Sequence, residues 1–223
     1  AVAANGYMYV MGGCSNTYTG CGSSGAVSTV YRGTIASGGT ISGWTNTNIN
    51  SLPAARYGLS AVVYNNTIYA MGGLNNGTFS NVVYSHPINT SNGNLSGAWT
   101  TEAVSLPTAM AYMKTLVYGG KLYLAGGCTA GATSCTTTSN TVYYTGFDSS
   151  NNLSGNFAST GTFATARGDF GFAAVNNHLY IAGGRTNTTY YSDTQSAPIN
   201  TDGSVGTWVT VSGATLATAR YGI

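Results

Sequence analysis

The sequence predicts an all-β fold built from four repeats of one four-stranded antiparallel unit. A nine-residue segment that ends in a double glycine occurs four times, and the double glycines open at Gly12, Gly72, Gly126 and Gly183. Their steps of 60, 54 and 57 residues are typical of a repeat architecture. Thr, Tyr and Val, which favour half-buried strands, are frequent, and no stretch shows helical periodicity.

The elements of each unit follow in one order. The double-glycine strand comes first, and the sequence writes it at 5–13, 65–73, 119–127 and 176–184. A variable loop and a second predicted strand follow, the latter at 27–35, 81–88, 141–147 and 193–199. A turn rich in Asn, Asp, Gly and Ser then leads to an aromatic residue, as hairpin connections require. The four aromatic residues are Trp44, Trp99, Phe157 and Trp208.

Four short strands per unit, separated by turns, are typical of the blade of a β-propeller. We therefore expect residues 1–223 to form a single β-propeller domain with repeats at about 1–59, 60–113, 114–170 and 171–223, cut within the first strand of a blade. Two arrangements remain open. Either the two ends meet and complete one blade, so that four blades close alone, or further blades or neighbouring copies complete a larger ring.

The order of double glycine, Tyr, Trp and P-x-x-R resembles the kelch repeat, and the resemblance covers essentially the whole chain. Phe157 replaces a Trp, Met110 replaces an Arg, and the later units lack the proline found at Pro53 and Pro107. The resemblance implies the propeller fold. Copper-radical kelch enzymes of the galactose oxidase type need two His, two Tyr and a Cys crosslinked to one Tyr. The chain has no matching His pair, which argues against that activity.

The repeated residues have a physical role in this fold. We expect each double glycine to end a strand where the backbone passes close to the neighbouring blade, because a Cβ atom would obstruct that approach. We expect the repeated aromatic residue to fill the wedge between two blades. Closure into a ring would then protect the edges of the sheets.

Composition excludes some classes of partner. Charged residues are 5% of the chain and the net charge is +2, so the sequence offers no basic patch for nucleic acid. No run of 18 apolar residues occurs, so we expect no membrane span.

The four cysteines form two equally spaced pairs at the same repeat position. Cys14 and Cys21 follow one double glycine, and Cys128 and Cys135 follow another with the same C-x6-C spacing. We predict the disulfides Cys14–Cys21 and Cys128–Cys135, and hence an extracellular, cell-surface or periplasmic location. The alternative is metal binding, but the only histidines, His86 and His178, are not repeat-equivalent. We therefore predict no metal and no cofactor.

Arg56, Arg167 and Arg220 share one repeat position, just before the first strand of a blade. In one interpretation each guanidinium caps backbone carbonyls between blades with its five donors. In the other, the three side chains surround the axis and hold a carboxylate or sulfate, so they are the candidate ligand-binding residues.

No catalytic group emerges from the sequence. The acids are too scattered for a paired-carboxylate glycosidase site or a calcium loop, and they are Glu102, Asp148, Asp169, Asp193 and Asp202. We predict a non-enzymatic extracellular binding, adhesion or surface-scaffold module that recognises a glycan or a surface protein through the loops after the double glycines. Two alternatives are a carbohydrate-active or small-anion-binding enzyme outside the cytosol, and a structural repeat unit of a larger surface assembly.

Overall fold

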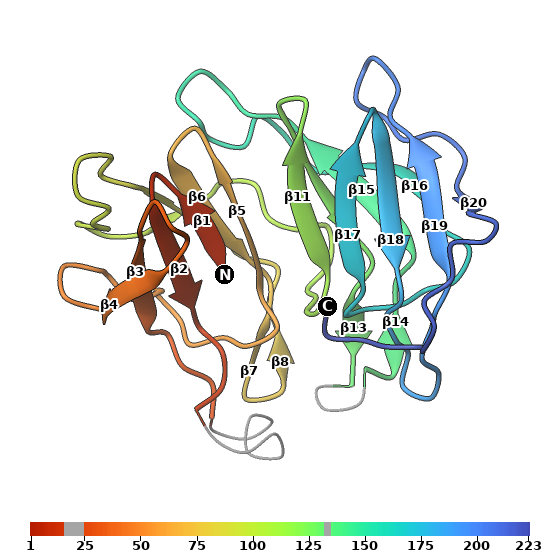
Figure 1. The fold of residues 1–223 in the computed structure, drawn as a ribbon, viewed down its shortest axis with the longest axis horizontal. Helices are drawn as coiled ribbons and strands as arrows, with labels where there is room; N and C mark the ends of the chain where they lie inside the picture. The colour runs from red at the N-terminus through yellow and green to blue at the C-terminus, as the bar shows by residue number, and fades with distance from the viewer. Residues whose placement is uncertain (16–24, 132–134) are drawn as a thin grey trace.

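The computed structural model describes residues 1–15, 25–131 and 135–223 and places four four-stranded antiparallel sheets side by side (Figure 1). This confirms the predicted all-β propeller fold. The described residues contain no helix, and so none long and apolar enough to cross a membrane.

Each blade runs from an inner to an outer strand. The strands of blades 1 and 2 are β1 (Val2–Ala4), β2 (Tyr7–Met11), β3 (Val30–Ile35) and β4 (Ile41–Thr45), then β5 (Ser60–Tyr64), β6 (Thr67–Met71), β9 (Val83–Pro87) and β10 (Thr100–Thr101). Those of blades 3 and 4 are β11 (Lys114–Tyr118), β12 (Lys121–Ala125), β15 (Thr141–Thr145) and β16 (Ala158–Thr162), then β17 (Gly171–Val175), β18 (His178–Ala182), β19 (Thr194–Pro198) and β20 (Val209–Thr210).

The two inner strands of every blade are joined by a two-residue turn. Both turn residues have positive φ, for example 43° at Asn65 and 59° at Asn66. That geometry belongs to the type I′ turn, which matches the twist of antiparallel strands and favours Asn and Gly. The turn fixes the register that follows, with Tyr64 opposite Thr67 and Ser60 opposite Met71.

Successive residues of a blade's second strand face different neighbouring blades. On β6, Tyr69 and Met71 pack toward blade 3, whereas Ile68 and Ala70 pack toward blade 1. We call the side turned to the next blade in the chain the forward face, and the side turned to the preceding blade the backward face. This two-sided burial explains why the strand has an apolar run instead of an alternating pattern.

The double glycines lie where the predicted close approach occurs. A Cβ atom at Gly72 would come within 2.6 Å of the Met110 carbonyl oxygen, which belongs to the segment leading into blade 3. The next amide, that of Gly73, donates a 2.8 Å hydrogen bond to the same carbonyl. Both glycines have positive φ, which glycine adopts without steric cost. The structure therefore confirms the expected role of the pair.

Three of the four repeated aromatic residues fill a wedge between blades. Trp99 and Phe157 are each 7% exposed, in the cores between blades 1 and 2 and between blades 2 and 3. Trp208 packs at the edge of the core between blades 3 and 4. Trp44 is 48% exposed, so the expectation is wrong for this residue. The reason is that Trp44 lies on the backward face of blade 1, which no blade of the described chain covers.

The inner strands lie in the order β1, β5, β11 and β17, and blades 1 and 4 are at opposite sides of the molecule (Figure 1). Val2–Ala4 alone supplies the inner strand of blade 1. The last residues pack on blade 4, where the Arg220 carbonyl accepts a 2.8 Å hydrogen bond from the Gly184 amide. The two ends of the chain therefore do not share a blade.

Candidate functional site at the loop end

The described parts of the loops that follow the double glycines of blades 2, 3 and 4 project from one end of the propeller, at the bottom of Figure 1, which we call the loop end. Two of them form short hairpins, β7 (Leu74–Asn75) with β8 (Thr78–Phe79) and β13 (Cys128–Ala130) with β14 (Thr137–Thr138). Their bases are fixed by backbone pairing to the segment that leads into the first strand of the same blade. Leu74 and Tyr57, for instance, exchange hydrogen bonds of 2.8 and 3.0 Å.

The Arg56 guanidinium is buried beneath the loop end. Its Nη1 donates to the carbonyl oxygen of Gly72 at 2.9 Å, and its Nη2 donates to the hydroxyl of Tyr84 at 3.0 Å. Burial lowers the pKa of Arg56, and the nearby Tyr84 opposes this shift. Arg56 thus makes the carbonyl-capping contact that the sequence offered as a structural role.

Arg167 is the most deeply enclosed of the three arginines, with its side chain 1% exposed. It donates to the Gly183 carbonyl at 3.0 Å and makes a two-pronged ion pair with Asp193 at 2.6 and 3.1 Å. Burial raises the pKa of Asp193, but the hydrogen bonds from Arg167 and Gln195 outweigh it and hold that pKa below its usual value.

Arg220 lies at the surface, and its Nε donates to the Thr218 carbonyl at 3.2 Å. The three predicted ligand residues thus have different surroundings. The guanidinium groups of Arg56 and Arg167 are held by groups next to them in the fold, and only Arg220 is exposed. Anion binding by this set stays a prediction.

A different arginine, Arg185, lies among aromatic rings at the loop end. Its Nε donates to Asp169 at 3.1 Å, and its guanidinium carbon lies 4.8 Å from the centre of the Tyr221 ring and 5.6 Å from that of Tyr112. Tyr221 stacks on Tyr190 with ring centres 5.1 Å apart. We call Tyr112, Asp169, Arg185, Tyr190 and Tyr221 the tyrosine–arginine cluster.

The outer rings of this cluster are open to solvent, with Tyr190 54% and Tyr221 48% exposed. Aromatic rings backed by a guanidinium present flat apolar surface together with polar edges. Such a surface suits a sugar ring or a partner's side chain. Sequence reasoning missed Arg185, although one signal was present. It directly follows a double glycine, where the other units have Cys14, Leu74 and Cys128.

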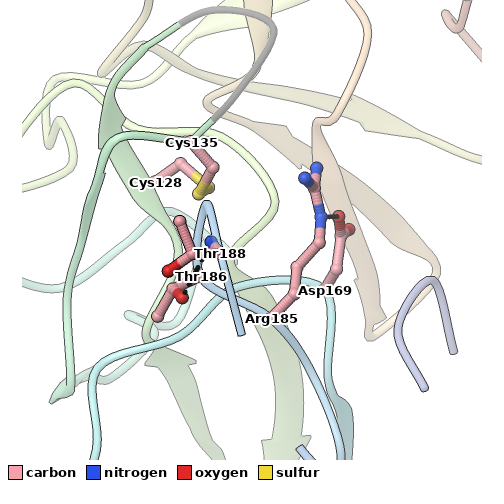
Figure 2. The surroundings of a disulfide bond; sticks show 6 residues. All are labelled: Cys128, Cys135, Asp169, Arg185, Thr186 and Thr188. Atoms are coloured by element: carbon pink, nitrogen blue, oxygen red, sulfur yellow. Dashed lines mark hydrogen bonds and ion pairs between the residues drawn. A yellow bond between two sulfur atoms is a disulfide. The ribbon is translucent and has the colours of Figure 1, made fainter. Parts of the chain in front are cut away.

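The disulfide Cys128–Cys135 closes the hairpin of blade 3, with the two Cα atoms 5.3 Å apart, and confirms one predicted pairing. Figure 2 shows it near Thr186 and Thr188 of the loop after β18, with the Arg185–Asp169 pair close by. Cys14 is also in a disulfide, but its predicted partner, Cys21, lies outside the described residues.

His86 and Glu102 are used in local structure. His86 is buried, packs edge-on against Trp99, and has ring nitrogens within 2.7 and 3.1 Å of the Pro87 and Gly97 carbonyls. Glu102 accepts hydrogen bonds from the Ser85 hydroxyl and the Leu153 amide. In the part of the chain that the structure describes, no three His, Cys, Asp or Glu side chains form a metal-binding group.

A hollow of about 380 Å³ lies beside the hairpin of blade 2, lined by Ala54, Arg56, Asn75, Asn76, Thr78 and Phe79. The Arg56 guanidinium that borders it is already committed to neighbouring oxygen atoms. The hollow therefore offers a partner mainly hydroxyl and amide groups of the hairpin.

Comparison with known proteins agrees with the geometry. The sequence pattern of the KLHDC2/KLHL20/DRC7 kelch-repeats domain matches residues 1–215. No curated protein matches the chain closely enough to count as a relative. Since the pattern covers nearly all of the four blades, the chain belongs to the kelch-repeat family.

Proposed function

We propose that this chain is a non-enzymatic binding module outside the cytosol, and that the loop end recognises a protein or a glycan. Kelch propellers are typically binding or scaffold modules. The observation that carries the proposal is the exposed, stacked pair Tyr190 and Tyr221 beside Arg185. Tyr and Arg are enriched among the residues that dominate the binding energy of interfaces, and Tyr supplies a large contact area at little cost in conformational freedom.

The frame beneath the cluster supports this role. Arg185 and Gly168 exchange two backbone hydrogen bonds of 2.9 Å, so the base of the loop is fixed. The Tyr221 backbone lies between Arg220, which pairs with Gly184 and Tyr191, and Gly222, which donates to the Asp169 carbonyl. A partner would therefore meet rings whose positions are set beforehand, which reduces the entropy lost on binding.

The described carboxylates support binding in preference to catalysis. Asp193 is paired with Arg167, Asp169 with Arg185, and Asp148 and Asp202 accept hydrogen bonds within their own turns. Hydrogen bonds within these turns lower the pKa of both turn carboxylates, led by Asn152 for Asp148 and by Ser204 for Asp202. Each acid thus has a structural partner.

The proposed location rests on the cysteines. The disulfide joins two cysteines seven residues apart, and disulfides form and persist in oxidising environments but are rare in the cytosol, where thiols are kept reduced. Thiol titration of protein secreted from an oxidising host should therefore detect no free thiol. Four reactive thiols in that material would contradict the proposed location.

The binding test is an array of glycans and extracellular proteins probed with the wild type and with Tyr190→Ala/Tyr221→Ala. We expect the double variant to lose at least tenfold in affinity for any partner of the wild type. The matched control is Ala158→Glu, an exposed position on the outer strand β16 of blade 3, which should bind normally. Equal binding by all three proteins would place the site elsewhere.

A further inference from the structure

Large apolar side chains are exposed at the two ends of the row of blades. Among the described residues, every exposed large apolar side chain belongs to blade 1 or to blade 4 and the segment after it. They are Val10, Tyr31, Ile41 and Trp44, and then Val175, Tyr190, Val209, Tyr221 and Ile223. The two inner blades have none, and outside the loop end, where Tyr190 and Tyr221 lie, this exposure follows the open faces of the molecule.

The open backward face of blade 1 has the same residues that are buried at every internal junction. The aliphatic residue before the outer strand is 0% exposed at Leu95, 6% at Leu153 and 7% at Val205, but its equivalent Ile41 is 40% exposed. Trp44, the equivalent of the buried Trp99, lies beside it. This face is therefore built like an interface.

The second strand of blade 1 shows the same difference in exposure from its equivalents in the other blades. Ala70, Leu124 and Ile181 are at most 2% exposed, whereas their equivalent Val10 is 38% exposed. Val10 lines an apolar hollow of about 290 Å³ together with Tyr31 and Trp44. A partner's side chain would fill this hollow.

The forward faces of blades 1 to 3 share a hydrogen bond to the next blade. The Tyr9 hydroxyl donates to the Gly93 carbonyl at 2.8 Å, and the Tyr123 hydroxyl donates to the Gly203 carbonyl at 2.8 Å. The Tyr69 hydroxyl donates in the same way to the Asn151 carbonyl. All three acceptors lie in the turn before the outer strand.

Blade 4 has the same tyrosine, Tyr180, on its open forward face. The carbonyl equivalent to Gly93, Asn151 and Gly203 is that of Gly39, in the turn two residues before Ile41 in blade 1. Gly39 also has the positive φ of that position, 81°. The donor at one end of the chain thus matches an acceptor at the other end.

A residue of each following unit packs over the first glycine of the pair. Met113 and Phe170 fill this position at Gly72 and Gly126 and are at most 1% exposed. Ile223 takes the position at Gly183 and is 45% exposed. Its exposed side therefore lies at the junction where blade 4 would meet a further blade.

A row of backbone hydrogen bonds joins the units next to the inner strands. The Tyr112 amide donates to Gly58, the Asp169 amide to Tyr112, and the Gly222 amide to Asp169, at 2.8 to 2.9 Å. All four residues have positive φ. The row ends with the Gly222 carbonyl at blade 4, and it begins with the Gly58 amide at the junction of blades 1 and 2.

We propose that a second copy of this chain covers both open faces, head to tail, and closes a ring of eight blades. The forward face of blade 4 packs on the backward face of blade 1 of the second copy, and the reverse junction forms at the same time. Tyr180 then donates to the Gly39 carbonyl of the second copy. The Gly222 carbonyl accepts from the Gly58 amide of the second copy.

Two copies are favoured because a heterologous contact that repeats the internal junction forms a closed ring only after a whole number of chains. Two chains give eight blades, at the upper end of the usual four to eight, whereas three chains would exceed it. Thr194 and Ser196 stand beside Tyr180 where blade 3 has Val142 and Tyr144. We therefore expect the contact between chains to be weaker than the internal junctions, with dissociation at micromolar concentrations.

The test is sedimentation velocity of the full 223-residue chain between about 1 and 200 μM. We expect a single larger species of twice the 22.8 kDa chain mass to replace the monomer as the concentration rises. Trp44→Glu should weaken the association constant at least tenfold. Ala158→Glu, an exposed outer-strand position of blade 3, is the matched control and should leave it unchanged.

Variants of the opposite face separate the head-to-tail contact from other dimers. Tyr180→Arg should also be monomeric, because each junction uses both faces. Tyr180→Phe should weaken association about two- to tenfold at each junction, as the loss of one hydrogen bond predicts. A mixture of Trp44→Glu and Tyr180→Arg retains one intact junction and should form a one-to-one complex.

Three results would overturn the proposal. One is a folded monomer at all concentrations, as expected if a different protein or other blades cover these faces. Another is a Tyr180→Arg variant that dimerises like the wild type, which would indicate pairing of blade 1 with blade 1. The third is continued growth to larger species, which would show that the junction does not close at two chains.

Discussion

Arg167 and Arg220 occupy the same repeat position but have opposite surroundings. The Arg167 side chain is buried and paired with Asp193, whereas Arg220 is exposed and bonds to a nearby carbonyl. Repeat position alone therefore does not decide what an arginine does. The difference arises because Arg167 lies between blades 3 and 4, whereas the blade that would cover Arg220 is not part of the described chain.

We expect Arg167→Ala to lower the free energy of unfolding by about 3 kcal/mol, because it leaves the Asp193 carboxylate partly buried without its counter-charge. Arg220→Ala should change it by less than about 0.5 kcal/mol. Urea denaturation of the two variants measures both changes in the free energy of unfolding. Equal losses would contradict the assigned contacts. Sulfate that stabilises the wild type but not Arg167→Ala would favour the anion-binding interpretation.

The buried tyrosines predict sensitivity to alkali. Burial raises the pKa of Tyr9 and of Tyr123 to about 12. The pKa of each tyrosine in the folded state lies above its unfolded value near 10. Each tyrosine's contribution to the free energy of unfolding is therefore complete below pH 10 and is lost as the pH rises toward 12.

The free energy of unfolding should therefore fall between pH 10 and 11.5, by up to about 1.4 kcal/mol per pH unit for each tyrosine. Tyr9→Phe should reduce this slope in urea titrations. An unchanged slope in Tyr9→Phe would refute the link.

At the scale of the element, the double glycine both ends a strand and allows the next unit to pack closely. Its first residue needs a left-handed backbone, and its Cβ position is occupied by the following unit. Sequence reasoning identified this element and its reason. The type I′ hairpins were equally accessible, because Asn and Gly tolerate the positive φ that both turn positions require.

Gly72→Ala and Gly119→Ala separate these two demands. The φ values are similar, 63° and 57°, but a Cβ at Gly72 would lie 2.4 Å from Met113 Cε and 2.6 Å from the Met110 carbonyl, whereas Gly119 has open space. We expect Gly119→Ala to cost about 1 kcal/mol for the backbone alone, and Gly72→Ala at least about 3 kcal/mol. Thermal unfolding of both variants measures this, and similar midpoints would mean that crowding is unimportant.

At the scale of the whole molecule, stability comes from junctions between blades. Each junction combines an aromatic wedge, a tyrosine hydrogen bond and backbone pairing of the double glycine with the next unit. A blade is thin, so both of its faces need cover. The described chain has three internal junctions for four blades, which leaves one face open at each end.

Trp99→Ala should cost about 3 to 5 kcal/mol of unfolding free energy, because it empties the wedge between blades 1 and 2. Trp44→Ala should cost less than about 1 kcal/mol in dilute solution, since the same repeat position is half exposed there. Chemical denaturation below 1 μM compares the two. Equal costs would show that blade 1 is covered from both sides.

The sequence by itself determined the propeller fold, the repeat elements, the role of the double glycines and the Cys128–Cys135 pairing. These features depend on local backbone geometry and on periodic burial, which the order of residues records directly. Only the tertiary structure decided that Arg56 and Arg167 are held by carbonyls and Asp193, that Arg185 lies among tyrosines, and that Trp44 is uncovered. Those properties depend on which neighbouring blade is present at each face, and equivalent residues in a repeat give no information about that.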